Sequence, residues 1–318
     1  MIRLSRRQFL AATSAAACAT AASVPPGSAP TVNSQGPYRG KLCFFSKPLP
    51  HMDWRRLAQS VKRMGFAGVD LTVRKGGHVK PERAAEDLPQ AVAVIREEGL
   101  EVPMITTALV SADDPTARPI LSTAGKLRIP FFKAGYYLYE FVDVRRELQK
   151  AGEQFRGLVE LAKQCGIQAG YHNHSEYIGA AMWDAAQFIE PLDPKWAGYY
   201  LDSCHLTGEG SVGAWKSGLH LAVNRLKMVA AKDFYWKRTT EGREYTVCPL
   251  GEGWVDWNYF LGVLAQHGFQ GPISLHIEYF EAAGGTPAEK EGEVLAAGQR
   301  DLAFLKARLA EAYKSSDK

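Results

Sequence analysis

Eight short apolar runs, separated by amphipathic stretches, constrain the fold of this chain more than any other feature of its sequence. Each run suits a β-strand buried on both faces, and the runs lie at 41–46, 67–73, 102–106, 129–134, 167–172, 197–202, 226–231 and 272–278. Apolar residues with helical periodicity fill the intervals at 53–64, 83–98, 114–127, 141–165, 182–190, 211–223, 256–267 and 287–312. This alternation predicts an α/β protein whose parallel strands close into a (β/α)₈ barrel.

The length of the chain suits one such barrel preceded by a leader. The chain has 318 residues, of which 46% are hydrophobic, whereas a (β/α)₈ barrel typically needs about 250. We expect the barrel to span 41–318, after a Gly- and Pro-containing linker at 31–40. Glycines that suit left-handed helix caps follow several helical stretches, at Gly65, Gly99, Gly166 and Gly268.

Residues 1–30 resemble a twin-arginine export signal. Arg6 and Arg7 precede a Phe-Leu pair and an Ala-, Ser- and Thr-rich stretch that is too short and too weakly apolar to span a bilayer. The resemblance implies that the twin-arginine export machinery is a partner and that the mature protein is periplasmic or extracellular. The alternatives are a disordered basic N-terminus and a lipid anchor at Cys18, but the alanines before Cys18 lack the large aliphatic residue of such anchors.

Charge and cysteine content argue against several classes of protein. The formal net charge is +4, and arginines of the leader supply three of these charges, so no basic surface remains to concentrate nucleic acid. Cys43, Cys165, Cys204 and Cys248 are scattered and include no Cys-x-x-Cys pair. Neither a zinc finger nor a dithiol redox site is therefore expected.

Polar residues close four of the apolar runs. They are Tyr171-His172-Asn173-His174, Asp202-Ser203-Cys204-His205, Lys232-Asp233 and His276-Ile277-Glu278. Successive clusters lie roughly 30 to 45 residues apart, which is the length of one βα unit. Because the carboxyl ends of all strands open on one face of a barrel, we expect these side chains to form a site there.

The donor types in these clusters suit a divalent metal ion. Asp202 and Glu278 offer carboxylates, His172 and His205 offer imidazoles, and all four lie at strand ends. This mixed set suits Mn²⁺, Co²⁺, Zn²⁺ or Fe²⁺ better than Ca²⁺, which prefers oxygen ligands. His172 and His174 alternate in direction along their strand, so one can face the barrel axis while the other supports it.

Lys232 and Glu278 are charged residues in runs that should be buried. A buried charge needs a partner, so one interpretation is a salt bridge between these two residues. In the other interpretation, Lys232 stabilises an enolate or acts as a general acid, and Glu278 or His174 moves a proton. We expect Lys232, Glu278 and His174 to be catalytic.

Two long connections on the same face should contact the substrate. They span 74–82 and 233–256, and we expect both to be irregular. Their aromatic side chains can stack on the apolar face of a sugar ring. The predicted substrate-binding residues in these loops and at the strand ends are Arg74, His78, Lys133, Tyr136, Asn173, Glu176, Asp233, Trp236, Glu252 and His276.

With these motifs the chain resembles the sugar phosphate isomerase and epimerase superfamily, the xylose isomerase-like TIM barrels. The similarity covers residues 41–312 and includes, beside the clusters above, Leu250-Gly251-Glu252-Gly253 and Gly271-Pro272-Ile273-Ser274. The resemblance implies a divalent metal ion at the strand ends and chemistry next to a carbonyl or hydroxyl group of a carbohydrate. By this likeness Asp202 and Glu278 match metal-binding carboxylates, and His205 matches a histidine that binds metal or substrate.

Two positions depart from the pattern of the superfamily. Many members carry a metal-binding histidine where this chain has Ala230, and a glutamate at the end of the fifth strand where this chain has His172. These departures leave open an isomerase, an epimerase or a lyase acting on a sugar, keto-sugar or polyol, and also a non-catalytic carbohydrate-binding protein. An abasic-site nuclease shares the fold but is disfavoured, because it needs more histidine and glutamate ligands and a basic face.

Overall fold

The computed structural model describes residues 36–240, 242–280 and 284–314. The predicted leader at 1–30 and the first part of the predicted linker lie outside the described residues. Within the described part of the chain, no helix is long and apolar enough to cross a membrane.

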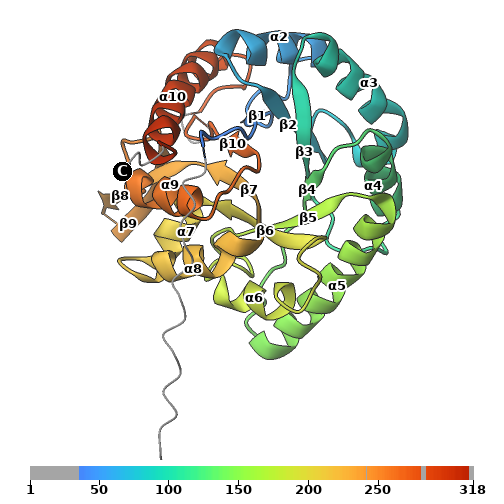
Figure 1. Cartoon of the computed structure of the whole chain (residues 1–318), viewed down its shortest axis with the longest axis vertical. Coiled ribbons are helices and arrows are strands. Elements are labelled where there is room, and N and C mark those ends of the chain that lie inside the picture. The colour runs from blue at the N-terminus through green and yellow to red at the C-terminus, as the bar shows by residue number, and fades with distance from the viewer. Residues whose placement is uncertain (1–35, 241, 281–283, 315–318) are drawn as a thin grey trace, which may run out of the picture. The chain divides into compact units, whose positions relative to one another are not determined.

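Eight strands of the described chain close into a parallel barrel, as the alternation of apolar and amphipathic segments predicts (Figure 1). They are β1 (Leu42–Phe45), β2 (Gly68–Val73), β3 (Glu101–Thr107), β4 (Phe131–Lys133), β5 (Gln168–His172), β6 (Ala197–Asp202), β7 (Leu226–Ala231) and β10 (Ile273–Leu275). β10 pairs with both β7 and β1 and so closes the barrel. All carboxyl ends therefore open on one face, where the polar clusters follow.

Helices surround the barrel in Figure 1. They are α2 (Trp54–Met64), η1 (Pro81–Arg83), α3 (Ala84–Glu97), α4 (Ala117–Lys126), α5 (Val144–Cys165), α6 (Trp183–Ile189), α7 (Ser203–Gly210), α8 (Ala214–Ala222), η2 (Val223–Arg225), α9 (Trp257–Gln266) and α10 (Glu291–Ala312). Asp53, Asp143 and Asp256 cap α2, α5 and α9 by accepting a hydrogen bond from a main-chain amide of the first turn. Gly65 and Gly166 end α2 and α5 with φ of 92° and 74°, the left-handed conformation that was predicted.

The connection after β6 differs from the prediction. The sequence predicts one helix at 211–223, whereas α7 follows β6 directly and α8 follows α7 after a short turn. α7 begins there because the Asp202 carboxylate accepts hydrogen bonds from the amides of Cys204 and His205, at 2.9 and 3.1 Å. Two glycines weaken the helical signal of α7, which is why its sequence does not predict it.

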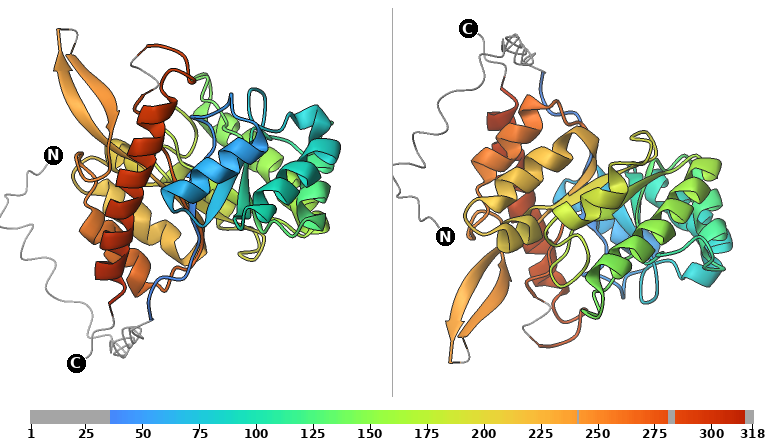
Figure 2. Two further views of the ribbon diagram at one scale, coloured as in Figure 1. Left: turned by 90° about the horizontal axis from the view of Figure 1, so that it is seen from above. Right: turned by 90° about the horizontal axis from the view of Figure 1, so that it is seen from below.

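The connection after β7 also differs from the prediction. Residues 233–256 are expected to be irregular, but β8 (Asp233–Thr239) and β9 (Gly242–Cys248) form an antiparallel hairpin. Figure 2 shows this hairpin as a narrow extension from the barrel. The overlooked signal is a pair of runs rich in aromatic and β-branched residues before and after Gly242, whose φ of 132° suits glycine.

Apolar side chains are buried in two separate clusters of the described chain. The larger cluster lies between the strands and the helices and includes Phe44, Leu71, Phe155 and Leu264. The smaller cluster consists of Met104, Tyr200, Met228 and Ala230, on β3, β6 and β7. Because side chains alternate across a strand, this second set fills the inside of the barrel. The barrel interior is therefore a packed core, on which the site rests.

Candidate active site

Lys232 lies at the centre of a cluster of charged and imidazole groups. It directly follows β7, and only 4% of the residue is exposed. Its Nζ atom lies 2.8 Å from His205 Nε2, 3.3 Å from Asp202 Oδ2 and 3.2 Å from Glu278 Oε2. Groups that follow β6, β7 and β10 thus meet around one ammonium, as expected from the common direction of the strands.

The carboxylate of Asp202 has a different role for each of its oxygen atoms. Oδ1 caps α7, whereas Oδ2 contacts Lys232 and lies 3.3 Å from His172 Nε2. The side chain of Asn173 fixes the backbone of Asp202. Asn173 Oδ1 accepts a hydrogen bond from the Asp202 amide at 2.7 Å, and Asn173 Nδ2 donates one to the Asp202 carbonyl oxygen at 3.2 Å. Asn173 was predicted to bind substrate, but its fully buried amide joins β5 to β6 instead.

Glu278 accepts hydrogen bonds from two lysines. Its Oε1 lies 2.6 Å from Lys47 Nζ and its Oε2 lies 3.2 Å from Lys232 Nζ. Lys47 was not among the predicted site residues, although its place just after β1 is the same signal that identified the others. His276, predicted to bind substrate, is 4% exposed and stacks on Phe45, with its Nδ1 3.6 Å from Glu278 Oε2. This arrangement makes His276 a support for the carboxylate.

Burial and opposite charge together set the protonation states of the cluster. Burial alone would raise the pKa of Asp202 and Glu278, but the Lys232 ammonium holds both pKa values well below their usual range. Burial alone would lower the pKa of Lys232, but the two carboxylates raise it well above its usual value. Burial lowers the pKa of His172 to about 3, and burial with the nearby ammonium lowers that of His205. At neutral pH the ammonium is therefore held between two carboxylates and neutral imidazoles.

His174 is the imidazole best placed to accept a proton. Its Nδ1 lies 2.8 Å from the carbonyl oxygen of Ser175, so Nδ1 carries the hydrogen and Nε2 keeps its lone pair. The His174 ring lies 3.9 Å from the ring of His205, which contacts Lys232. Burial lowers the pKa of His174, so the ring is neutral at neutral pH. The site thus places a neutral base close to a fixed positive charge.

Lys133 and Tyr136, both predicted to bind substrate, lie on the β4 side of this site. Lys133 ends β4, is 2% exposed, and places its Nζ 3.4 Å from the centre of the Tyr136 ring. Burial lowers the pKa of Lys133 well below its usual range. The Tyr136 ring also lies edge-on to the rings of His172 and His174, at 5.7 and 4.9 Å. Tyr136 therefore connects the β4 side of the site to the histidines.

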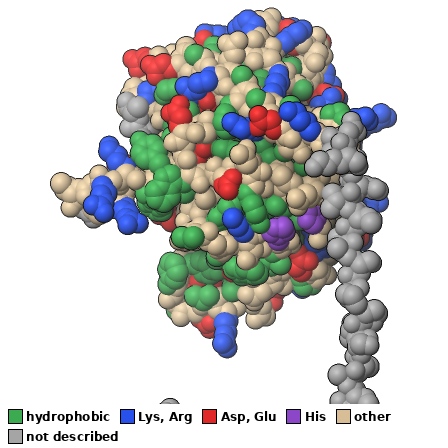
Figure 3. Space-filling view, turned by 60° about the vertical axis from the view of Figure 1, so that its left-hand side comes forward, with side chains coloured by type: hydrophobic (Ala, Val, Ile, Leu, Met, Phe, Trp, Pro, Cys, Tyr) green, Lys and Arg blue, Asp and Glu red, His purple; other side chains and the backbone are tan. Residues whose placement is uncertain are grey.

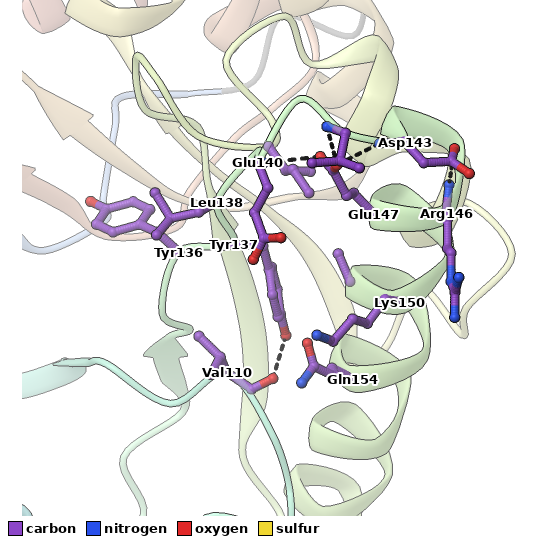
Figure 4. A pocket seen from close by; sticks show the side chains of 13 residues that line it. Val110, Tyr136, Tyr137, Leu138, Glu140, Asp143, Arg146, Glu147, Lys150 and Gln154 are labelled. Atoms are coloured by element: carbon purple, nitrogen blue, oxygen red, sulfur yellow. Dashed lines mark hydrogen bonds between the residues drawn. The ribbon is translucent and has the colours of Figure 1, made fainter.

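A pocket of about 590 Å³ adjoins Tyr136. Figure 4 shows the residues that line it, with the Tyr137 hydroxyl donating to the Val110 carbonyl at 2.7 Å. In the same view the Tyr136 ring points away from Glu147 and Lys150. Tyr136 is therefore shared by this pocket and by the histidine cluster.

Asp233, predicted to bind substrate, has its carboxylate engaged in hydrogen bonds within the protein. Its fully buried carboxylate accepts hydrogen bonds from the main-chain amides of Phe234, Gly251 and Val255 and from Trp257 Nε1, at 2.8 to 3.1 Å. These contacts hold the return of the hairpin against the start of α9. Both oxygen atoms are used in this way, so Asp233 shapes the loop.

His78, also predicted to bind substrate, has both ring nitrogen atoms in contact with other parts of the protein. Its Nε2 lies 3.0 Å from the carbonyl oxygen of Leu49, and its Nδ1 lies 3.3 Å from the Thr72 hydroxyl. Burial lowers its pKa to about 4. Both ring nitrogen atoms therefore connect this loop to the barrel wall.

The remaining predicted substrate-binding residues lie around the margin of the site. The Arg74 guanidinium lies over the Phe45 ring at 5.7 Å, and Glu176 and Glu252 are exposed. Trp236 packs against Tyr245 within the hairpin and lines a groove of about 580 Å³ at its base. Figure 3 shows apolar side chains gathered on this face of the molecule. The structure gives Trp236, Glu176 and Glu252 no contact with Lys232 among the described residues.

A buried polar layer beneath the site was not predicted. Asp70 is fully buried on β2 and accepts hydrogen bonds from the hydroxyls of Ser274 and Tyr200, at 2.8 and 3.3 Å. The Tyr200 hydroxyl lies 3.0 Å from His276 Nε2, and His276 in turn supports Glu278. The usable signal is Asp70 itself, a carboxylate inside an apolar strand, which requires buried partners.

Tyr245 reaches the site from β9 and was also not predicted. Its hydroxyl contacts Cys204 Sγ and lies 3.4 Å from His205 Nδ1, and its ring stacks parallel to that of His205. Ser175 Oγ lies 3.1 Å from the same Nδ1. No local motif marks Tyr245, because its position depends on the length and twist of the hairpin.

The predicted metal ligands do not fit a divalent ion in this arrangement. Among the described residues, no group of three or more His, Cys, Asp or Glu is arranged to hold a metal ion. Asp202, His205 and Glu278 do converge, but on the Lys232 ammonium at 2.8 to 3.3 Å. Bonds to such a metal ion are about 2.0 to 2.2 Å long.

Fold and site together define an α/β-barrel protein with a cluster of charged and imidazole groups at the strand ends. Residues 58–306 match the family described as Xylose isomerase-like TIM barrel, and the chain belongs to this family. No curated protein matches the chain.

Solved structures share the fold at low sequence identity. D-allulose 3-epimerase from Methylomonas sp. is 16% identical with a TM-score of 0.64, covering 86% of this chain and 99% of that one. A xylose isomerase-like TIM barrel protein from Mycobacterium smegmatis in complex with magnesium is 16% identical with a TM-score of 0.67, covering 88% and 100%. The IOLI protein with a bound zinc atom is 15% identical with a TM-score of 0.65, covering 85% and 99%. At these identities the similarity shows the fold.

Proposed function

We propose that this protein is a sugar isomerase or epimerase that moves a proton on a carbon next to a carbonyl group. The observation that carries the proposal is the Lys232 ammonium, fixed between two carboxylates and close to the neutral imidazole of His174. Proton abstraction next to a carbonyl needs a base at the carbon and positive charge at the oxygen. The names of relatives such as D-allulose 3-epimerase support a carbohydrate as the substrate.

Each residue of the site has its own role in the proposed reaction. The positive charge of the Lys232 ammonium stabilises the negative charge that develops on the substrate oxygen in the enediolate. His174 Nε2 takes the proton from the adjacent carbon. In isomerisation it returns this proton to the former carbonyl carbon, while the proton of the neighbouring hydroxyl group moves to the former carbonyl oxygen. In epimerisation it returns the proton to the other face of the same carbon after the enediolate has turned over in the site. Asp202 and Glu278 keep Lys232 charged, so Glu278 serves as a partner of the ammonium. Its lowered pKa makes Glu278 a weaker base than His174.

The predicted metal dependence is the alternative to polarisation by Lys232. Its support is that two structures of similar fold contain magnesium and zinc. A bound ion would polarise the substrate oxygen, which is the task that the Lys232 ammonium can perform by itself. Metal analysis of the protein decides between the two, as described below.

A substrate screen tests the proposed function. Free sugars, keto-sugars and glycosides are incubated with the protein in deuterated water, and each product is identified by mass and by NMR. Deuterium uptake without loss of mass supports isomerisation or epimerisation, whereas loss of water or of an aglycone indicates a lyase. Saturable sugar binding without exchange would identify a carbohydrate-binding protein and contradict the proposal.

We also propose export by the twin-arginine route, which makes an unphosphorylated sugar the expected substrate. The support is the sequence of the leader, with Arg6 and Arg7 before a small-residue stretch. Replacing both arginines by lysine should retain the precursor inside the cell, as measured by fractionation. An exported double variant, or a wild-type protein found in the cytoplasm, would contradict this localisation.

A further inference from the structure

We propose that the Lys232 ammonium is the permanent cation of this site, so that the wild-type protein binds no divalent metal ion there. A protonated lysine has three N–H donors and no acceptor. Three acceptors of the described chain surround Nζ, namely His205 Nε2 at 2.8 Å, Glu278 Oε2 at 3.2 Å and Asp202 Oδ2 at 3.3 Å. The donors of the ammonium are thus matched by the same groups that would otherwise bind a metal ion.

The backbone holds Lys232 in this position. The Ser203 hydroxyl donates to the Lys232 carbonyl oxygen at 2.7 Å, and the Lys232 amide lies 3.2 Å from the same hydroxyl. Lys232 is 4% exposed, so its side chain has little access to solvent. A metal ion could bind between these ligands only after the Lys232 side chain had moved away. The displaced ammonium charge would then lie among other buried groups.

The residue two positions earlier on β7 offers no ligand in place of the lysine. Ala230 is fully buried and pairs with Asp202 on β6 and with Ser274 on β10. Lys232 comes two positions later, directly after the end of β7. The inner wall of β7 therefore contributes an apolar surface and an ammonium, and neither can coordinate a metal ion.

The charges of the site point to the same conclusion. Asp202 and Glu278 supply two negative charges, and Lys232 and Lys47 lie against them at 2.6 to 3.3 Å. The buried Lys232 ammonium already supplies a cation to both carboxylates. A divalent ion added beside it would be repelled by this ammonium. A metal ion is expected to be excluded by charge as well as by volume.

The inference has two parts, and only the second rests on the proposed function. The first part is a statement about binding: the site excludes metal ions because Lys232 occupies it. The second part is that the ammonium alone polarises the substrate oxygen, so turnover should be insensitive to chelators.

Metal analysis of the full-length, untagged protein tests the first part. The protein is incubated with Mn²⁺, Co²⁺ or Zn²⁺, one ion at a time, then desalted and analysed by inductively coupled plasma mass spectrometry. We expect metal content far below one ion per chain for the wild type. One ion per chain that is lost in Asp202→Asn would overturn the proposal, whatever the variants below show.

Lys232→Ala is the complementary variant. Removing the ammonium leaves Asp202, His205 and Glu278 around one space, and we expect the variant to bind about one ion per chain and to melt at higher temperature when Mn²⁺ or Zn²⁺ is added. Lys227→Ala is the matched control, because Lys227 lies at the other end of β7 and donates to neutral oxygen atoms of Gln168 and Pro194. A folded Lys232→Ala protein that gains no metal would refute exclusion by this ammonium.

Turnover separates the two parts. If no sugar reacts, the proposed function fails, but the metal content of the wild type still decides the first part. If a sugar does react, we expect equal rates with and without a chelator. A rate that falls with chelator and returns with Mn²⁺ or Co²⁺ would contradict the second part.

Discussion

The β7 side and the β4 side of the barrel mouth each bury a lysine. The surroundings raise the pKa of one lysine and lower the pKa of the other. Lys232, after β7, lies between the carboxylates of Asp202 and Glu278, which raise its pKa. Lys133, at the end of β4, has the face of the Tyr136 ring as its partner, and burial lowers its pKa. Burial is similar at both positions, so the difference comes from the charges nearby. The pKa of the same residue type is therefore raised on one side and lowered on the other.

The largest expected effect comes from Lys232→Met. This variant leaves two buried carboxylates without their shared cation, so the free energy of unfolding should fall by about 3 to 5 kcal/mol. Turnover should fall by about 10² to 10³ beyond any loss of folded protein. Urea unfolding and rates for the folded fraction measure the two effects. Unchanged stability would show that another cation balances the carboxylates, and unchanged turnover would remove Lys232 from the mechanism.

His174→Gln tests whether the base is this histidine, which follows β5 between the two sides of the comparison. Glutamine keeps the size of the side chain but cannot accept a proton at neutral pH, so turnover should fall by about 10² to 10⁴. Stability should change little, because the residue is only partly buried. Deuterium exchange into the substrate measures the step directly. Full exchange in this variant would assign the base to another group, and Lys133, whose pKa is lowered by burial, is the next candidate.

Lys133→Met tests the other half of the comparison through pH. In the folded protein the pKa of Lys133 is lowered, whereas in the unfolded chain it is about 10.4. Between these two values the unfolded state binds more protons, so stability of the wild type relative to the variant should rise with pH, by up to about 1.4 kcal/mol per unit. Urea unfolding at several pH values between neutral and about 10 measures this difference.

Lys232→Met should behave differently in the same titration. The pKa of Lys232 is raised in the folded protein, so both states are protonated below the unfolded value of about 10.4. Its contribution is therefore constant up to that pH and is lost only as pH rises through the higher folded pKa. Parallel curves for the two variants would show that both lysines are charged, and the contrast between the two sides would fail.

The smallest expected effect is that of Tyr245→Phe. The change removes one hydroxyl that contacts Cys204 and His205 but keeps the stacked ring. We expect stability to fall by about 0.5 to 1.5 kcal/mol. Tyr235→Phe, on the exposed part of the same hairpin, is the control and should be neutral. Equal effects of the two changes would show that the hairpin does not support the Lys232 side.

The sequence predicts the barrel well because its signals are local. Each apolar run and each amphipathic stretch carries its own periodicity, and caps such as Gly65 and Gly166 mark the ends. The hairpin was missed because its aromatic and charged residues look like a binding loop. α7 was missed because its start depends on a capping contact with Asp202, which also closes β6.

The candidate site was predictable only in part. Strand order brings Asp202, Lys232 and Glu278 to one face, and their charges show that they need partners. Asp233 and His78 carry the same signal, yet main-chain groups use their polar atoms. Position at a strand end gives proximity, but the direction of a side chain and the number of its remaining contacts depend on the folded backbone.

Asp202 combines two duties in one side chain, since one oxygen starts α7 and the other contacts Lys232. Natural selection therefore acts on position 202 twice. Asparagine at this position could still cap α7 but would remove the negative charge. A residue that cannot cap a helix would remove the charge and also leave the first amides of α7 without their acceptor. Most substitutions at position 202 should therefore impair folding, whatever their effect on catalysis. During evolutionary divergence, substitution of Lys232 should therefore be more frequent than substitution of Asp202, because no helix cap depends on Lys232.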